Sequence, residues 1–261
     1  MFNTSHRAFV GTSATLFVAS TAVTISWCNS MSAMPDMPMP GGWNMSMMWM
    51  RMPGQTRPAM ATAFLGMWLV MMVAMMLPVL MPMLWRYRRA VALTEHRHID
   101  TLTTLVGAAY FFVWTLFGAI VFLLGTILTS LEMQSLALSR AVPTAIGVIM
   151  LACGALQFSA WKAHHLACCR RATPDRCRTL PADLRSAWRH GLRLGLHCVH
   201  CCFGLTMLLL VAGVMDLRAM ALVTAAISVE RLAPSGPRVA RLIGVVLVAA
   251  GLLLVGYTAL A

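Results

Sequence analysis

The chain has 261 residues, of which 59% are hydrophobic and only 11% are charged. Soluble domains carry roughly 25% charged residues, so this composition excludes an ordinary soluble domain and indicates a membrane protein. The formal net charge of +12 does not predict a nucleic-acid partner, because the basic residues follow the loops of a membrane topology.

Seven apolar runs predict helices, since about 20 apolar residues are enough to cross a bilayer. The runs are 8–28, 60–85, 101–130, 141–161, 191–215, 218–232 and 240–261, of which 218–232 is short. The expected fold is all-α, a polytopic transmembrane bundle of about seven helices. The first run could instead be a cleaved signal peptide, because a short charged start precedes it. Six helices would then remain.

The basic residues are unevenly distributed between the two sides that these runs define. Sixteen of the twenty, Lys162 and Arg231 among them, fall on the side of the N-terminus, and the other four are Arg51, Arg57, Arg140 and Arg218. Loops rich in Lys and Arg stay in the cytoplasm. The sequence therefore predicts a cytoplasmic N-terminus and an external C-terminus, with membrane lipids as the surroundings.

Three parts are expected: a first transmembrane helix or signal peptide (1–28), a Met-rich external loop (29–59) and a six-helix metal-binding membrane domain (60–261). The loop lacks a clear helix or strand period, which predicts a largely irregular segment. Two interpretations of the loop are open. Its methionine thioethers could bind soft Cu(I), or its Met and Trp side chains could anchor it at the membrane surface. The methionines are Met31, Met34, Met37, Met39, Met45, Met47, Met48, Met50 and Met52.

The run 60–85 carries two methionine stripes. One stripe repeats every four residues through Met67, Met71 and Met75, and the other contains Met72 and Met76, which places the stripes on adjacent faces of a helix. Met also fills gaps in apolar cores, so metal binding and core packing are both open. Two prolines at positions 78 and 82 are expected to bend this helix.

The segment KAHHLACCRR begins at residue 162. If the fourth helix continues through it, His164 pairs with Cys168 and His165 with Cys169, each at i, i+4. Zinc-binding H-E-x-x-H helices present two ligands on one face in the same way. The segment is therefore a candidate metal site, or a polar cytoplasmic loop with incidental thiols.

The hexapeptide HCVHCC occupies residues 197–202, inside an otherwise apolar run. On a helix, His197 pairs with Cys201 and Cys198 with Cys202, and His200 adds a further imidazole. Polar side chains within a membrane are costly and indicate function. Three glycines on the same helix are expected to permit close packing against a neighbour: Gly191, Gly195 and Gly204.

Thiol chemistry is the competing interpretation. Seven of the eight cysteines map to the cytoplasmic half or loop, where a reducing environment favours metal or redox chemistry over disulfides. Cys198 and Cys201 form a C-x-x-C, which is compatible with thiol–disulfide exchange involving Cys168 or Cys169. Haem c attachment is excluded, because it requires His where Cys202 stands.

Three blocks resemble a bacterial family known as predicted metal-binding integral membrane proteins, over roughly residues 60–250. The matching residues are Trp68, Met71, Met72, Ala74, Met75, Met76 and Pro78; then Gln157, Lys162, Leu166, Cys169 and Arg170; then Cys198, Cys201, Cys202, Gly213, Met215, Asp216 and Glu230. The resemblance implies metal binding in a bacterial inner membrane.

Some positions depart from the family pattern. His165 replaces Cys, Leu156 replaces Tyr, His200 replaces Gly and Phe203 replaces Trp. An imidazole in place of a thiol keeps a ligand but hardens the site, which weakens the preference for Cu(I) over zinc. His197 and His200 add ligands beyond the pattern.

The leading hypothesis is a non-enzymatic copper protein for Cu(I) trafficking, buffering or cuproenzyme assembly. Methionines would capture the ion outside and Cys and His groups would hold it in the inner half, with zinc as the alternative metal. A protein partner, either a membrane complex or a metallochaperone, is compatible with this role. The competing hypotheses are a membrane thiol-disulfide oxidoreductase using Cys198 and Cys201, and a structural subunit of a membrane complex.

Overall fold

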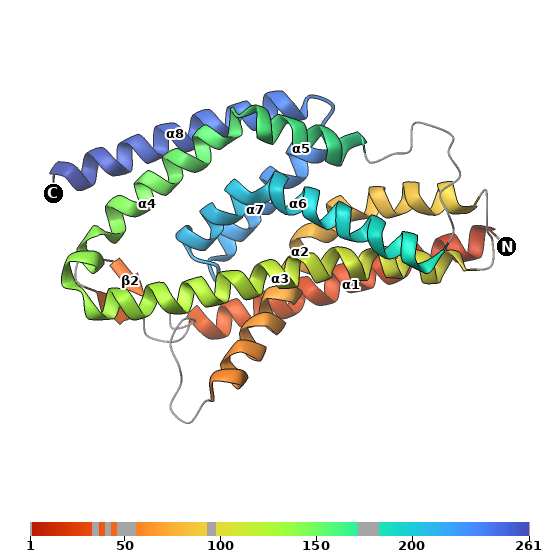
Figure 1. The fold of residues 1–261 in the computed structure, drawn as a ribbon, viewed down its shortest axis with the longest axis horizontal. Helices are drawn as coiled ribbons and strands as arrows, with labels where there is room; N and C mark the ends of the chain where they lie inside the picture. The colour runs from red at the N-terminus through yellow and green to blue at the C-terminus, as the bar shows by residue number, and fades with distance from the viewer. Residues whose placement is uncertain are drawn as a thin grey trace.

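The computed structural model describes residues 2–32, 37–39, 43–45, 56–92, 98–171 and 183–260. These residues form helices and one pair of short strands, and the all-α prediction is confirmed (Figure 1). The elements in chain order are α1 (Phe2–Ser32), β1 (Met37–Met39), β2 (Trp43–Met45), α2 (Arg57–Ala92), α3 (Ile99–Gln134), α4 (Leu136–Gln157), α5 (Ala160–Arg171), α6 (Leu184–Ala212), α7 (Leu217–Leu232) and α8 (Gly236–Leu260).

Each of the seven predicted runs corresponds to a helix of its own, and α5 is additional. The runs 141–161 and 191–215 extend past the ends of α4 and α6, at Gln157 and Ala212. Six helices in the described part of the chain, α1, α2, α3, α4, α6 and α8, are long and apolar enough to cross a membrane. With 16 residues, α7 is about 24 Å long, which is shorter than a hydrocarbon core of about 30 Å. The predicted fourth helix does not continue into KAHHLACCRR, because α4 ends at Gln157 and α5 begins after Phe158 and Ser159.

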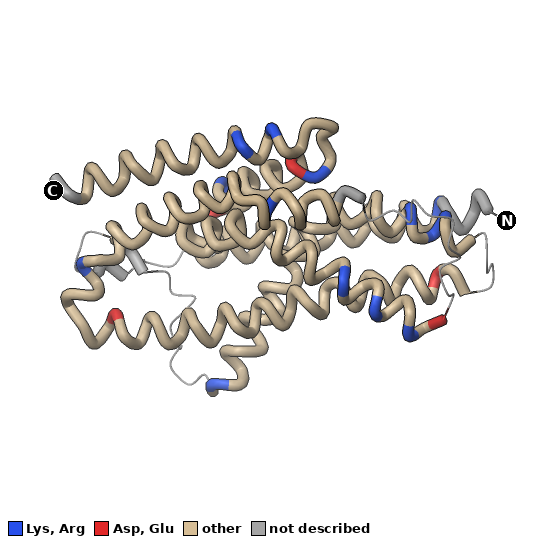
Figure 2. The backbone as a smooth tube through the Cα atoms, turned by 45° about the horizontal axis from the view of Figure 1, so that its top comes forward, with Lys and Arg blue, Asp and Glu red and all other residues tan. Residues whose placement is uncertain are grey.

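The long helices run back and forth along one direction, so that the two chain ends lie at opposite ends of the molecule (Figure 1). Several basic residues gather at the end that carries the N-terminus (Figure 2). The predicted loop positions of Lys162 and Arg231 are wrong, since these side chains are only 4% and 6% exposed. Both are buried between helices.

Close packing of α6 on α3 depends on two of the three predicted glycines. A Cβ atom on Gly191 would lie 2.5 Å from the Val106 carbonyl oxygen, and one on Gly195 would lie 3.0 Å from that of Tyr110. The third glycine, Gly204, has ordinary spacing, with the nearest atom of Cys153 at 3.6 Å. The tight contact places the N-terminal half of α6 directly against α3.

The second helix, α2, remains a single helix through Pro78 and Pro82 and changes direction along its length (Figure 1). This agrees with the predicted bend, because each proline lacks a backbone donor and its ring crowds the preceding turn.

The Met-rich segment contains more regular structure than the sequence predicts. β1 and β2 pair antiparallel, with Met37 opposite Met45 and Met39 opposite Trp43. The indole Nε1 of Trp43 donates to the Ser139 carbonyl oxygen at 2.9 Å, which ties the strand pair to α4. Met34, Met47, Met48, Met50 and Met52 lie outside the described residues.

Candidate metal centre

Four thiols from α5 and α6 meet in the core. Cys169 lies on α5 and Cys198, Cys201 and Cys202 lie on successive turns of α6, each at most 1% exposed. The sulfurs of Cys198 and Cys202 are 3.9 Å apart, and the thiol of Cys201 is hydrogen-bonded to those of Cys169 and Cys202. The two cysteine-bearing segments of the sequence therefore form one thiol cluster (Cys169, Cys198, Cys201 and Cys202).

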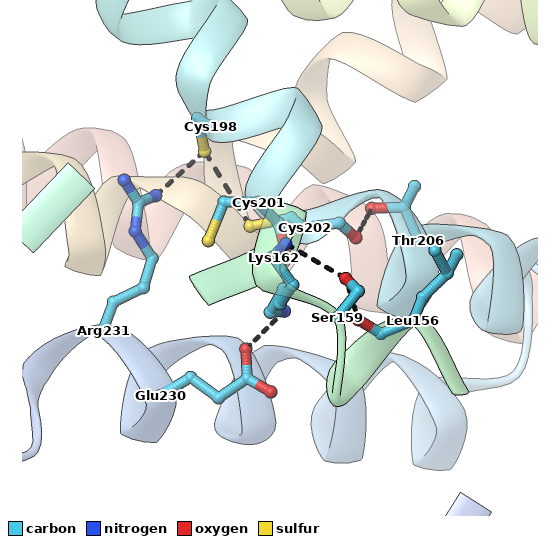
Figure 3. Close-up of polar contacts among 9 residues, drawn as sticks. All are labelled: Leu156, Ser159, Lys162, Cys198, Cys201, Cys202, Thr206, Glu230 and Arg231. Carbon is cyan, nitrogen blue, oxygen red and sulfur yellow. Dashed lines mark hydrogen bonds and ion pairs between the residues drawn. The ribbon is translucent and has the colours of Figure 1, made fainter. Parts of the chain in front are cut away.

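A guanidinium and a phenol contact the first of these thiols. Arg231 on α7 donates from Nη1 to the Cys198 sulfur at 2.9 Å (Figure 3), and its Nη2 lies 3.9 Å from the Met83 sulfur on α2. The hydroxyl of Tyr110 on α3 lies 2.9 Å from the same Cys198 sulfur. The positive charge of Arg231 offsets the negative charge that a thiolate or a bound anion would bring into this apolar region.

A buried ion pair supports the cluster from the other side (Figure 3). The Lys162 ammonium lies 2.8 Å from the Glu230 carboxylate and donates to the Cys201 carbonyl oxygen at 2.7 Å. Burial opposes the charge on Lys162, but the Glu230 carboxylate outweighs this effect and raises the pKa of Lys162 above its ordinary value. The ion pair joins α5 to α7 next to the thiols.

The predicted histidines form a second group at the edge of the cluster. The Nδ1 atoms of His165 and His197 are 3.3 Å apart, and the rings of His165 and His200 stack with centroids 4.9 Å apart. Burial and the neighbouring imidazoles lower the pKa of His165, which favours the neutral form that binds metal ions. His200 is exposed and His165 and His197 are half-buried, so this group faces outward.

Two of the four predicted i, i+4 pairs occur. The Cys168 sulfur is 3.7 Å from Nε2 of His164, and Cys198 contacts Cys202. The members of the other two pairs contact residues of the neighbouring helix instead. His165 on α5 contacts His197 on α6, and Cys169 on α5 contacts Cys201 on α6. Thiols and imidazoles are therefore sorted into a buried and an outer group.

The predicted methionine stripes of α2 are buried. The exposed fractions are 2% for Met71, 0% for Met72, 3% for Met75 and 0% for Met76, and all four belong to the same continuous core as the thiol cluster. Their burial is expected of core residues and of metal ligands alike, so ligand roles for these methionines stay a prediction.

Within the described residues, no three His, Cys, Asp or Glu side chains are arranged to hold a metal ion as they stand. The thiols instead form hydrogen bonds with one another and with Arg231. A soft ion could replace these hydrogen bonds, because thiols lose their protons when they bind metal. A cavity of about 140 Å³ adjoins Cys169, Arg231 and Met83 and gives space beside the cluster.

The roles of Tyr110 and Arg231 were not predicted from the sequence, and Lys162, predicted to be a charge at the membrane edge, is buried. One usable signal was present, since Lys162 is the only lysine in the chain. A single lysine between apolar helices, with an acidic residue at 230, fits a buried ion pair better than a topology signal. Nothing in the local sequence distinguishes Tyr110.

Comparison with known proteins supports a role in copper handling. The family PpoB2, described as a copper chaperone, matches residues 65–254, a span that includes the thiol cluster, the histidines and the buried ion pair. No curated protein and no solved structure matches the chain significantly. The match covers well over half of the chain, which therefore belongs to the PpoB2 copper chaperone family.

Proposed function

We propose that this chain is a membrane copper chaperone that binds Cu(I) as cargo at the thiol cluster. The observation that carries the proposal is the convergence of four thiols from α5 and α6 in one buried, mutually hydrogen-bonded group. Membership of a copper chaperone family supports copper as the metal.

The ligand chemistry suits Cu(I). Thiolates are soft ligands and Cu(I) is a soft cation. Four thiolates also form a tetrahedral zinc set, so the match to a copper chaperone family is what favours Cu(I) over zinc. Arg231 supplies positive charge at the Cys198 sulfur, which reduces the cost of holding a thiolate away from water. Zinc is the alternative metal, because the outer imidazoles of His165, His197 and His200 could join a thiol in a mixed site.

The proposed location is a bacterial inner membrane, with the N-terminus in the cytoplasm and the C-terminus outside. Support comes from the six helices long enough to span and from the basic residues at the end that carries the N-terminus (Figure 2). In this orientation the thiol cluster lies in the cytoplasmic half. The segment 29–59 is then external, and the stripes of Met71, Met72, Met75 and Met76 lie between that segment and the thiols.

The second candidate function is thiol–disulfide exchange, favoured by the contacts among the cysteines. Every cysteine in the described residues is a free thiol, and Cys198 and Cys202 are within contact distance. An oxidoreductase would cycle between these thiols and a disulfide without a metal. The two functions therefore differ in what the purified protein contains.

Metal analysis of the full-length protein tests the proposal. The reduced wild-type chain, equilibrated with Cu(I) under anaerobic conditions, is expected to retain copper near stoichiometrically. The triple variant Cys198→Ser/Cys201→Ser/Cys202→Ser should lose at least one copper equivalent, while the matched control Cys153→Ser, a buried thiol on α4, should lose none. A wild-type protein that binds no copper and forms a reversible disulfide would favour the oxidoreductase instead.

A further inference from the structure

We infer that the chain has a second soft-metal site, formed by Cys28, Met215 and Met220 just beyond the C-terminal end of α6. The Cys28 sulfur on α1 lies 3.9 Å from the Met215 sulfur and 3.9 Å from the Met220 sulfur. Cys28 is 3% and Met220 is 5% exposed. Three sulfur ligands thus converge from α1, from the turn between α6 and α7, and from α7 itself.

The two sulfur separations from Cys28, each 3.9 Å, match a three-coordinate site. Metal–sulfur bonds of about 2.3 Å to three ligands in one plane place the sulfurs about 4 Å apart. In the proposed site, Cu(I) binds between Cys28 and the two methionines. One thiolate and two neutral thioethers form a soft donor set, and together with Cu(I) they carry no net charge, which suits a buried position.

The turn that carries Met215 is held at both of its ends. Gly213 ends α6 with a φ of 111°, in the region that favours glycine over residues with a Cβ atom. Asp216 then begins α7, and its carboxylate accepts hydrogen bonds from the backbone N–H groups of Arg218 and Ala219. This fixed turn presents Met215 to α1.

A carboxylate lies close to this site in the chain. Asp216 directly follows Met215 and is exposed. It would attract a cation that approaches from this end of the molecule. The same end carries the start of the Met-rich segment, since Cys28 lies in the last turns of α1 (Figure 1).

This site is separate from the thiol cluster. From Cys202 to Gly213, α6 rises about 16 Å, so one ion cannot bind at both places. Cys28 also precedes the residues 65–254 that match the copper chaperone family. The inference rests on the proposed function for the identity of the metal, but its ligands are different residues.

The test uses the full-length chain with Cys198→Ser/Cys201→Ser/Cys202→Ser as the background, so that the thiol cluster is absent. Cu(I), with Ag(I) as a redox-inert probe, is titrated against a competing chelator. The background variant is expected to bind one ion. Adding Cys28→Ser, Met215→Leu or Met220→Leu should weaken that binding by on the order of 100-fold or more. Loss of a residue that only hydrogen-bonds to a metal ligand already costs about 10- to 100-fold in metal affinity, and these substitutions remove a ligand itself.

Folding and specificity have their own controls. Met→Leu conserves volume, so the metal-free melting temperatures of Met215→Leu and Met220→Leu should stay close to that of the background. Cys153→Ser should leave the retained ion unchanged. A background variant that binds no ion, or whose binding is unaffected by Cys28→Ser, overturns this site and leaves the thiol cluster untouched. If the background keeps all of the wild-type copper and Cys28→Ser removes it, this site stands and the proposed function fails.

Discussion

Single residues around the thiol cluster carry charge that water does not reach. Lys162 and Glu230 are 4% and 1% exposed and form an ion pair of 2.8 Å. Removing one partner from such a pair strands the other charge in an apolar region, which is more costly than removing both. The ion pair therefore holds α5 on α7 and fixes Cys169 relative to α6.

Lys162→Met and Glu230→Gln are each expected to destabilise the protein by about 3–5 kcal/mol, and Lys162→Met/Glu230→Leu should regain part of that loss. Thermal unfolding in detergent measures the effect. The control is Asp100→Asn at the exposed Arg88–Asp100 pair, where a loss below about 1 kcal/mol is expected. Single variants at Lys162 or Glu230 that melt like the wild type would disprove a structural ion pair.

The sorting of imidazoles and thiols leads to a prediction about metal choice. His165→Ala is expected to weaken zinc binding while Cu(I) binding changes by less than about tenfold, because the thiol cluster holds soft ions without the histidines. Cys201→Ser should weaken Cu(I) binding much more strongly. Competition titrations with each metal measure both affinities. Equal losses of Cu(I) binding in the two variants would show that imidazoles and thiols form one site.

At the scale of elements, the position of α6 on α3 determines which side chains reach Cys198. The absence of a Cβ atom at Gly191 brings α6 close to the backbone of α3, and Tyr110 is thereby placed 2.9 Å from the Cys198 sulfur. Packing of two helices by small residues is common in membranes.

Gly191→Ala is expected to force α6 away from α3, because the new methyl group would lie 2.5 Å from the Val106 carbonyl oxygen. Overpacking of this kind costs about 1–3 kcal/mol, and thermal unfolding measures it. The matched control is Gly204→Ala on the same helix, whose methyl group would have ordinary contacts and should be neutral or slightly stabilising. Equal melting temperatures for the two variants would contradict the close approach.

Much of the element structure follows from the apolar runs, because their lengths predict membrane helices. Several helices begin before their runs, because the first turns include polar residues that follow an N-cap such as Asp183 of α6. α4 and α6 end before their runs do, at Gln157 and Ala212. The break before α5 was not predicted. The sorting of histidines from cysteines was not predictable either, because it depends on the rotation of α5 relative to α6.

The contact of Cys28 with Met215 was equally hidden in the sequence, since 187 residues separate them and no local pattern joins them. The thiols themselves were recognisable, because polar and thiol groups are dense within an apolar run. Chemistry that is concentrated in a short segment can be predicted from sequence, whereas partners supplied by distant helices require the packed structure.

At the scale of the whole molecule, the sidedness depends on α7. The chain alternates in direction through α6, α7 and α8 (Figure 1), although α7 has only 16 residues. If α7 crosses, the N- and C-termini lie on opposite sides of the membrane. If only the six long helices cross, both termini lie on the same side.

Reporter fusions distinguish these topologies. A reporter that is active only in the cytoplasm should be active when fused after residue 176, and one that is active only outside should be active at the C-terminus, following the positive-inside rule. Inactivity after residue 176 would reverse the proposed orientation. Cytoplasmic activity at both positions would show that α7 does not cross.

The proposed function requires that the buried thiols hold Cu(I). X-ray absorption on the full-length Cys28→Ser/Met215→Leu/Met220→Leu variant, loaded with one equivalent of Cu(I), tests this requirement, because sulfur and nitrogen ligands give different bond lengths. We expect a reduced copper edge with sulfur ligands at about 2.3 Å, and both features should be lost when Cys198, Cys201 and Cys202 are also changed to Ser. A shell dominated by nitrogen or oxygen, or a spectrum unchanged by those three substitutions, would contradict it.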